Sequence, residues 1–282
     1  MYDTVIIGKG PAGISSAIYL SRALKSVLVI SNGTGDLGKA ILIENYYGFD
    51  KISGSELSQK GIKQAEHFGA DFADGEVVAI ERGENFSVKT ASESFEAKTV
   101  LLATGKSKTP LKTEGFEKYI GYGISTCAVC DGFLYRDKHI ALIGCGNYAA
   151  HELSFLLKFT KDITVFTNGE KDISKDIPSD IKINNEHITK FNGDTKFKSI
   201  ATENGEYEFD AAFVAIGTAN ASSFAKTLGI IEKDGHISVD ENFSTNIKGI
   251  FAAGDCTGGL YQVVKAASDG ALAAMSILKF LK

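Results

Sequence analysis

Residues 2–13 read YDTVIIGKGPAG, and residues 139–149 repeat the pattern as HIALIGCGNYA. In each stretch a short apolar run leads into a Gly-x-Gly-x-x-Gly or Gly-x-Gly-x-x-Ala turn, after which apolar residues recur at helical spacing. A further apolar run follows each helix, at 27–30 and at 163–166. A strand, a glycine turn, a helix and a second strand in this order are typical of dinucleotide-binding units. The sequence therefore predicts two such units.

The rest of the chain indicates how the two units are connected. Each unit runs on to an apolar strand and a small-residue turn, which contains Gly105 in the first unit and Gly217 in the second. The tail, a strand after Gly249 and a helix rich in Ala and Leu, does not continue the second unit, and we expect it to return to the first. The sequence thus predicts an α/β fold of two Rossmann-like domains, the second inserted into the first. The predicted boundaries are 1–111 and 241–282 for the first domain and 112–240 for the inserted one.

Composition excludes several classes of function. The 282 residues are 44% hydrophobic and 23% charged, which is enough for a sizeable core. Thirty basic residues against 35 acidic ones give a net charge of −5 without Lys/Arg clusters, which argues against nucleic-acid or anionic-membrane binding. Residues 112–240 hold 14 Lys/Arg and 19 Asp/Glu, so the predicted insert carries the whole excess.

The sequence also favours a cytoplasmic location. No apolar run approaches the ~20 residues that a membrane helix needs. The first residues lack the basic and long apolar regions of a signal peptide. Four cysteines are too few for a disulfide scaffold in a chain of this length.

The first glycine turn has the residues of a pyrophosphate site. Gly8, Gly10 and Gly13 allow a tight turn and a close approach of the backbone, and the following helix N-terminus attracts a negative charge. The alternative is a strand-to-helix turn without a ligand. Ser31 and Asn32 stand where an acidic residue for the ribose is expected, which weakens the adenosine contact.

The second glycine turn lacks the charges that NADPH requires. A 2′-phosphate is bound by Arg through strong charge-assisted hydrogen bonds. Residues 167–172 at the end of the next strand offer no Arg, one Lys and two acidic residues. The sequence disfavours NADPH, whereas NADH and an empty site both stay open.

A third candidate site follows the strand after Gly249. Asp255 lies on a glycine turn beside a helix start, with Gln262 close behind. A carboxylate there suits a ribitol hydroxyl, and a plain helix cap is the alternative.

Cys127 and Cys130 are separated by two residues, so they can form a disulfide and reopen it, and Asp131 is placed to give or take a proton. A zinc half-site and a pair of small buried side chains are the alternatives. No second ligand pair accompanies the cysteines, so we predict no metal. Cys145 and Cys256 are interpreted as inert fillers, and no histidine is assigned a role.

Residues 126–133, TCAVCDGF, resemble the redox motif of the low-molecular-weight thioredoxin reductase family. Residues 44–48, ENYYG, resemble its flavin-proximal segment, and residues 251–255, FAAGD, with Gln262 resemble its closing FAD motif. The likeness extends over essentially the whole chain. It implies bound FAD, a thioredoxin or thioredoxin-like substrate, and a homodimer.

The resemblance also implies roles for single residues. Cys130 would exchange electrons with the flavin, Cys127 would attack the partner's disulfide, and Asp131 would donate a proton. The residues implied to bind FAD are Gly8, Gly10, Pro11, Ala12, Gly13, Asn45, Gly254, Asp255, Gln262 and Val263.

Two departures from the family pattern concern the electron donor. NADPH-using members carry a His-Arg-Arg run and a further Arg where this chain has Thr167, Asn168, Gly169 and Ile173. Residues 35–38, GDLG, stand where a Gly-Gly-Gln run is typical. This pattern resembles an atypical branch from anaerobic bacteria and some cyanobacteria, whose members reduce thioredoxin with electrons from ferredoxin or another flavoprotein.

Two other functions stay open at this point. An NADH- or NADPH-dependent reductase of thioredoxin or of a peroxiredoxin-type disulfide would keep the same chemistry with another donor. A non-catalytic flavin-binding redox sensor would use the cysteine pair without turnover.

Overall fold

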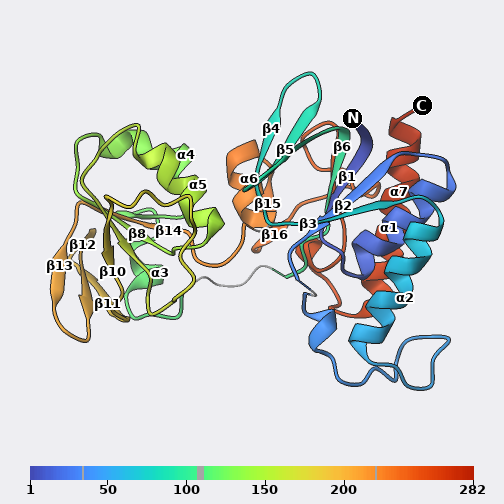
Figure 1. The fold of residues 1–282 in the computed structure, drawn as a ribbon, viewed down its shortest axis with the longest axis horizontal. Helices are drawn as coiled ribbons and strands as arrows, with labels where there is room; N and C mark the ends of the chain where they lie inside the picture. Colours follow the sequence, from blue (N-terminus) through green and yellow to red (C-terminus); the bar gives the residue numbers. More distant parts are fainter. Residues whose placement is uncertain (34, 107–110, 220) are drawn as a thin grey trace. The chain divides into compact units, whose positions relative to one another are not determined.

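The computed structural model describes residues 1–33, 35–106, 111–219 and 221–282. The chain forms two compact units, Met1–Ser107 with Asn220–Lys282, and Lys108–Ala219 (Figure 1). The first unit is therefore made of two separate stretches of chain. This arrangement of Rossmann-like α/β units confirms the predicted fold class.

A mostly parallel sheet forms the centre of the first unit. Its strands follow the order β3-β2-β1-β6-β5-β4, with β17 beside the C-terminal half of β6. The bounds are β1 Tyr2–Ile7, β2 Val27–Ser31, β3 Asp71–Asp74, β4 Val77–Arg82, β5 Phe86–Thr90, β6 Ser94–Leu102 and β17 Ile250–Ala252. The small two-stranded sheet consists of β15 Glu232–Lys233 and β16 His236–Ile237. Because β17 pairs in parallel with β6, the tail returns to the first unit as the sequence predicts.

The helices of this unit pack on the sheet through small residues. The bounds are α1 Pro11–Arg22, η1 Leu37–Lys39, α2 Gly54–His67, α6 Ala221–Leu228, η3 Asp255–Thr257 and α7 Val263–Phe280. A Cβ on Gly270 of α7 would lie 2.0 Å from the carbonyl oxygen of Ala12 in α1. The two helices therefore approach closely, and both bury alanines in one core with Leu101 and Phe251.

The second unit has a five-stranded parallel sheet and a three-stranded antiparallel one. The order in the first sheet is β10-β9-β8-β14-β7 and in the second β11-β12-β13. The strand bounds are β7 Ile124–Ser125, β8 Ile140–Ile143, β9 Ile163–Phe166, β10 Lys182–Asn184, β11 Ile188–Gly193, β12 Phe197–Thr202, β13 Glu206–Glu208 and β14 Ala211–Val214. The helices are α3 Phe116–Tyr119, α4 Ala128–Asp131, η2 Gly132–Tyr135 and α5 Asn147–Leu156. One core lies between α5 and the parallel sheet, and a phenylalanine-rich core joins the two sheets.

The compact units differ from the predicted insert at its C-terminal end. The second unit ends at Ala219, and residues 221–240 belong to the first unit instead of to a domain of 112–240. The physical reason is packing: α6 buries Phe224 and Ala225 and lies against β4, and β16 contacts η3.

This boundary also changes the distribution of charge. Residues 108–219 hold 13 Lys/Arg and 16 Asp/Glu, a net charge of −3, whereas the first unit holds 17 and 19, a net charge of −2. The excess negative charge is thus shared between the units and is not confined to the insert. Within the residues that the structure describes, no helix has both the length and the apolar character of a membrane span.

Candidate active site and cofactor site

Cys127 and Cys130 form a disulfide in the second unit, with an S–S distance of 2.10 Å and 5.3 Å between the Cα atoms. Cys127 is the N-cap of the short helix α4, and its Sγ accepts a hydrogen bond of 3.2 Å from the Cys130 N–H. Cys127 is only 4% exposed, whereas Cys130 is half-buried. The more exposed of the two residues is the one that the resemblance assigns to the flavin.

The structure brings Asp131 to the same turn. The Ser125 hydroxyl donates a hydrogen bond of 2.6 Å to Asp131 Oδ2 and accepts one of 3.1 Å from the Cys127 N–H. Burial, followed by the charge of Asp131, raises the pKa of the Tyr135 hydroxyl. Asp131 is half-buried, so its carboxyl group keeps contact with solvent at this turn. Sequence reasoning missed Ser125, which has no motif of its own.

A second carboxyl group contacts the start of α4. Glu152 lies on α5, is 4% exposed, and its Oε2 accepts a hydrogen bond of 2.6 Å from the Ala128 N–H. Burial raises the pKa of Glu152 to about 7, although the Ala128 N–H acts in the opposite direction. Sequence reasoning missed this residue too. The sequence feature that could have revealed it is an acidic residue on the same face of α5 as the buried Ala149, Leu153 and Leu156.

The first glycine turn has a shape that fits a pyrophosphate. Gly8 has a φ of +111°, and a Cβ there would lie 2.2 Å from the Ala103 carbonyl oxygen. A Cβ on Gly13 would lie 1.9 Å from the Gly8 carbonyl oxygen, so both positions require glycine. In contrast, a Cβ on Gly10 would meet no atom within 4 Å. Open space at the N-cap of α1, followed by Pro11, is what a phosphate-binding helix N-terminus provides.

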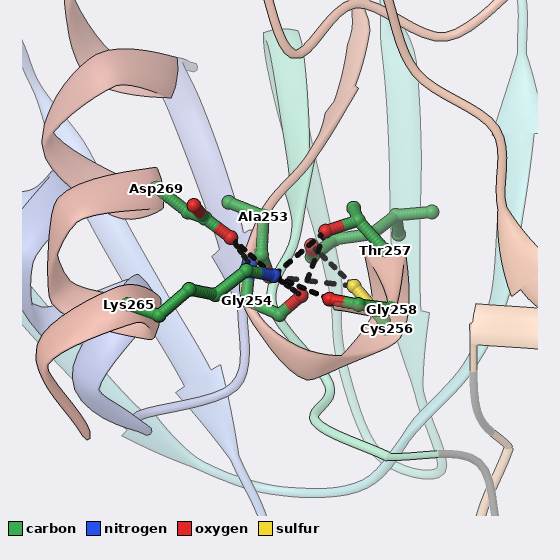
Figure 2. A network of polar contacts seen from close by, with 8 residues as sticks. Ala253, Gly254, Cys256, Thr257, Gly258, Lys265 and Asp269 are labelled. Atoms are coloured by element: carbon green, nitrogen blue, oxygen red, sulfur yellow. Dashed lines mark hydrogen bonds and ion pairs between the residues drawn. The ribbon is translucent and has the colours of Figure 1, made fainter. Parts of the chain in front are cut away.

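The Gly-Asp turn is held by a network of polar contacts centred on Lys265 (Figure 2). Lys265 Nζ donates to the carbonyl oxygens of Gly254 and Gly258, at 3.2 and 2.5 Å, and forms an ion pair of 2.7 Å with Asp269. Asp269 Oδ2 also accepts from the Gly254 N–H at 3.1 Å. Lys265 and Asp269 were missed by sequence reasoning, because their spacing of four residues on a helix is common.

The same turn places the predicted ribitol-binding residues together. Asp255 begins η3, and desolvation by burial is the main cause that raises the pKa of its carboxyl group. Asn45 Nδ2 donates a hydrogen bond of 2.8 Å to Gln262 Oε1, although 217 positions separate the two residues. Gln262 is the N-cap of α7, which starts at Val263. A Cβ on Gly254 would lie 2.9 Å from Ala12 Cβ, so the Gly-Asp turn adjoins the start of α1.

All ten residues predicted to bind FAD therefore lie in the first unit, around the N-termini of α1 and α7. Backbone donors at one end and the Asn45, Asp255 and Gln262 side chains at the other match the anionic and hydroxyl groups of a flavin dinucleotide. The residues present fit the cofactor.

The second glycine turn is different. The Ser174 N–H donates to the Cys145 carbonyl oxygen at 2.8 Å, and the Ser174 hydroxyl donates to Asn147 Oδ1 at 2.8 Å. The segment after β9 is thus bonded to the turn where a dinucleotide would lie. At the end of β9, Asn168 Oδ1 accepts from the Ile188 N–H at 2.8 Å. A Cβ on Gly169 would lie within 2.9 Å of the His187 ring.

The two remaining cysteines are free and buried. Burial raises the pKa of the Cys256 thiol to about 12 and also raises that of Cys145. Neither thiol is poised to react as a thiolate at neutral pH. Among the described residues there is no group of three or more His, Cys, Asp and Glu side chains that could hold a metal ion.

The chain matches several known proteins over its whole length. Residues 2–270 match the model of the pyridine nucleotide-disulphide oxidoreductase family. The chain is 33% identical to a thioredoxin reductase of Listeria innocua, over 100% of this chain and 94% of the relative.

Two solved structures are also similar. The atypical thioredoxin reductase TRi of Desulfovibrio vulgaris Hildenborough has a TM-score of 0.94 and 33% identity, covering 100% of this chain and 98% of that one. A ferredoxin-flavin thioredoxin reductase of Clostridium acetobutylicum has a TM-score of 0.75 and 33% identity, covering 99% and 97%. The chain belongs to the pyridine nucleotide-disulphide oxidoreductase family, as an FAD-binding enzyme of the thioredoxin reductase type.

Proposed function

We propose that Cys127 and Cys130 carry electrons from FAD to the disulfide of a thioredoxin or thioredoxin-like protein. The observation that carries this proposal is the disulfide itself, which lies at the start of α4 beside two carboxyl groups. When bound, FAD supplies the electrons that reduce this disulfide. The reduced pair then serves as the thiol donor, and the ten residues of the first unit named above hold the cofactor.

The exchange with thioredoxin follows ordinary thiol chemistry. The Cys127 thiolate attacks one sulfur of the partner's disulfide and forms a mixed disulfide, while the other partner sulfur leaves as a thiolate. Cys130 then attacks the Cys127 sulfur, which reforms the bond within this chain and releases the reduced partner. Asp131 donates a proton to the leaving sulfur. The likeness to thioredoxin reductases supports a homodimer.

We infer further that the electron donor is not a pyridine nucleotide, and that ferredoxin takes this place. Two observations on the second unit support this. Two hydrogen bonds of Ser174 attach the segment after β9 to the glycine turn, and the end of β9 carries Glu170 and Asp172 but none of the Arg side chains that a 2′-phosphate requires. One similar structure, the ferredoxin-flavin thioredoxin reductase of Clostridium acetobutylicum, points in the same direction.

An NADH-dependent reductase is the second candidate. A Cβ on Gly146, at the N-cap of α5, would have only the Gly217 carbonyl oxygen near it, at 3.8 Å. This position keeps the space that a pyrophosphate needs, and NADH carries no 2′-phosphate.

Anaerobic reduction of the holoenzyme separates the donors. Oxidised enzyme is mixed in parallel with NADPH, NADH and reduced ferredoxin, and the loss of flavin absorbance is followed, with free FAD as the control for direct reduction. We expect rapid bleaching with reduced ferredoxin and none with either nucleotide on the same timescale. Rapid bleaching by NADH would favour the second candidate, and rapid bleaching by NADPH would contradict the electrostatic argument.

A further inference from the structure

Glu152 is a buried carboxyl group that the exchange reaction described above does not use. It is 4% exposed, on α5, and its Oε2 lies 2.6 Å from the backbone nitrogen of Ala128. Ala128 directly follows Cys127 in the chain. The side chain therefore contacts the peptide group that joins the first redox cysteine to α4.

This hydrogen bond provides an acceptor for a backbone N–H group at the start of α4. The first N–H groups of a helix have no intrahelical acceptor. In α4 the Cys130 N–H donates a hydrogen bond to Cys127 Sγ, and the Ala128 N–H donates one to Glu152. Because Ala128 is itself fully buried, loss of this acceptor would leave a buried donor unsatisfied. Glu152 thus fixes the start of α4.

We propose that Glu152 is a positioning residue of the redox centre, which holds the Ala128 amide in place and takes up a proton when the Cys127–Cys130 disulfide is reduced. This inference rests on the proposed redox role of the two cysteines. It concerns the disulfide alone and is independent of the electron donor and of the thioredoxin partner.

The proton uptake follows from the charge balance. Two electrons break the S–S bond and leave two sulfur anions, one of which binds a proton and becomes a thiol. The other is the thiolate that the attack on a partner disulfide requires. A carboxylate buried close to a thiolate is disfavoured by like-charge repulsion, so an ionised Glu152 binds the second proton. Above the pKa of about 7 that burial gives Glu152 in the disulfide form, reduction takes up two protons with two electrons.

Several other titratable groups lie around α5. The titratable groups on this helix and on the segments packed against it include Asp131 on α4, Tyr135 on η2, Cys145 in the glycine turn, Tyr148 and His151 on α5, Lys158 over the Phe155 ring, and Glu170, Lys171, Asp172, Lys175 and Asp176 in the segment after β9. None of the carboxylates among them is buried as Glu152 is. β8 carries no titratable side chain.

The test measures the disulfide equilibrium directly. Wild type, Glu152→Gln and Glu117→Gln holoenzymes are equilibrated anaerobically with mixtures of dithiothreitol and its oxidised form at pH 6, 7 and 8. Samples are quenched in acid and alkylated, and the fractions of reduced Cys127 and Cys130 are read by mass spectrometry. Glu117 is an exposed residue of the same unit, so its variant controls for the loss of one negative charge. A glutamine oxygen still accepts from the Ala128 N–H, so Glu152→Gln removes the proton site and keeps the hydrogen bond.

We expect the reduction equilibrium constants of Glu152→Gln and wild type to agree within about twofold at pH 6 and to differ about tenfold at pH 8, with the variant the easier to reduce. Wild type provides a second measurement should the variant fail to fold. Dithiothreitol releases two protons, so the wild-type constant should stop rising with pH above about 7.

A ratio between variant and wild type that is equal at pH 6 and pH 8 would overturn the proposal, because a purely structural role does not depend on pH. A difference as large in Glu117→Gln would overturn it as well. A pair that dithiothreitol cannot reduce reversibly in any of the three proteins would instead overturn the redox role of Cys127 and Cys130, and this inference with it.

Discussion

The two carboxyl groups bonded to the redox turn have different surroundings, and this difference separates their roles. Asp131 is half-buried and is bonded to the Ser125 hydroxyl. Glu152 is buried and is bonded to a backbone N–H. We propose that Asp131, which solvent reaches, acts in proton transfer, and that Glu152, which is buried against the Ala128 amide, positions the redox turn.

Replacement of Asp131 by Asn should slow thiol exchange without changing the fold. General acid catalysis contributes about 10²–10⁴-fold, so we expect a loss of at least ~10²-fold in the rate. The measurement is the single-turnover oxidation of dithiothreitol-reduced enzyme by oxidised thioredoxin. Asp137→Asn, an exposed position in the same unit with a positive φ that Asn tolerates, is the matched control. Equal rates in the two variants would contradict the role of Asp131.

Glu152 should also make folding stability depend on pH. Its pKa is raised from 4.5 to about 7 in the folded protein, so the folded state binds the proton more tightly than the unfolded state. Stability is therefore full below about pH 4.5 and is lost as the pH rises toward 7, by roughly 3 kcal/mol. Urea unfolding at pH 5 and pH 7.5 should show this loss in wild type and not in Glu152→Gln. The same pH dependence in both proteins would contradict the prediction.

At the scale of elements, the N-termini of α1 and α7 are held beside the Gly-Asp turn by two kinds of contact. Lys265 and Asp269 tie the turn to α7 by an ion pair and hydrogen bonds. Gly270 lets α7 approach the backbone of α1 at Ala12. The first contact is polar and the second is steric, so they can be removed separately.

Lys265→Met should weaken both the turn and cofactor binding. Asp269 is buried and would lose its cation, and breaking a buried ion pair by removing one partner costs about 3–5 kcal/mol. Because the Lys265 side chain is 23% exposed, we expect the low end of this range or less. Thermal unfolding and the FAD retained after gel filtration are the two readouts. Lys279 is exposed on the same helix, so Lys279→Met should change the free energy of unfolding by no more than about 0.5 kcal/mol and should leave the retained FAD unchanged. A matching loss in Lys279→Met would show that the Lys265 network is not the cause.

Gly270→Ala should destabilise the first unit, although alanine favours a helix over glycine by ~1 kcal/mol. The added Cβ would lie 2.0 Å from the Ala12 carbonyl oxygen, so α1 and α7 would have to separate. We expect a lower melting temperature and weaker FAD retention, because both helix N-termini adjoin the cofactor site. Ser268→Ala, at an exposed position of α7, is the control. A rise in melting temperature for Gly270→Ala would mean that the close approach is not required.

At the scale of the whole molecule, the sequence predicted two glycine-turn units with one inside the other, because each strand, turn and helix is encoded locally. The second compact unit ends at Ala219 and not at the predicted 240, because residues 221–240 return to the first unit through the packing of Phe224 and Ala225, which no local sequence pattern marks. Ser125, Glu152 and Lys265 were missed because none of them lies in a recognisable sequence motif.

We propose that in the whole molecule electrons reach thioredoxin through Cys127 and Cys130 without a pyridine nucleotide. The most direct measurement is the anaerobic reduction of thioredoxin by reduced ferredoxin, catalysed by wild type, Cys127→Ser, Cys130→Ser and the buried control Cys145→Ser. We predict turnover by wild type and Cys145→Ser, and a loss of at least ~10³-fold in both other variants, since neither retains an exchangeable pair. Turnover by Cys127→Ser or Cys130→Ser, or turnover by wild type with NADPH in place of ferredoxin, would contradict the account.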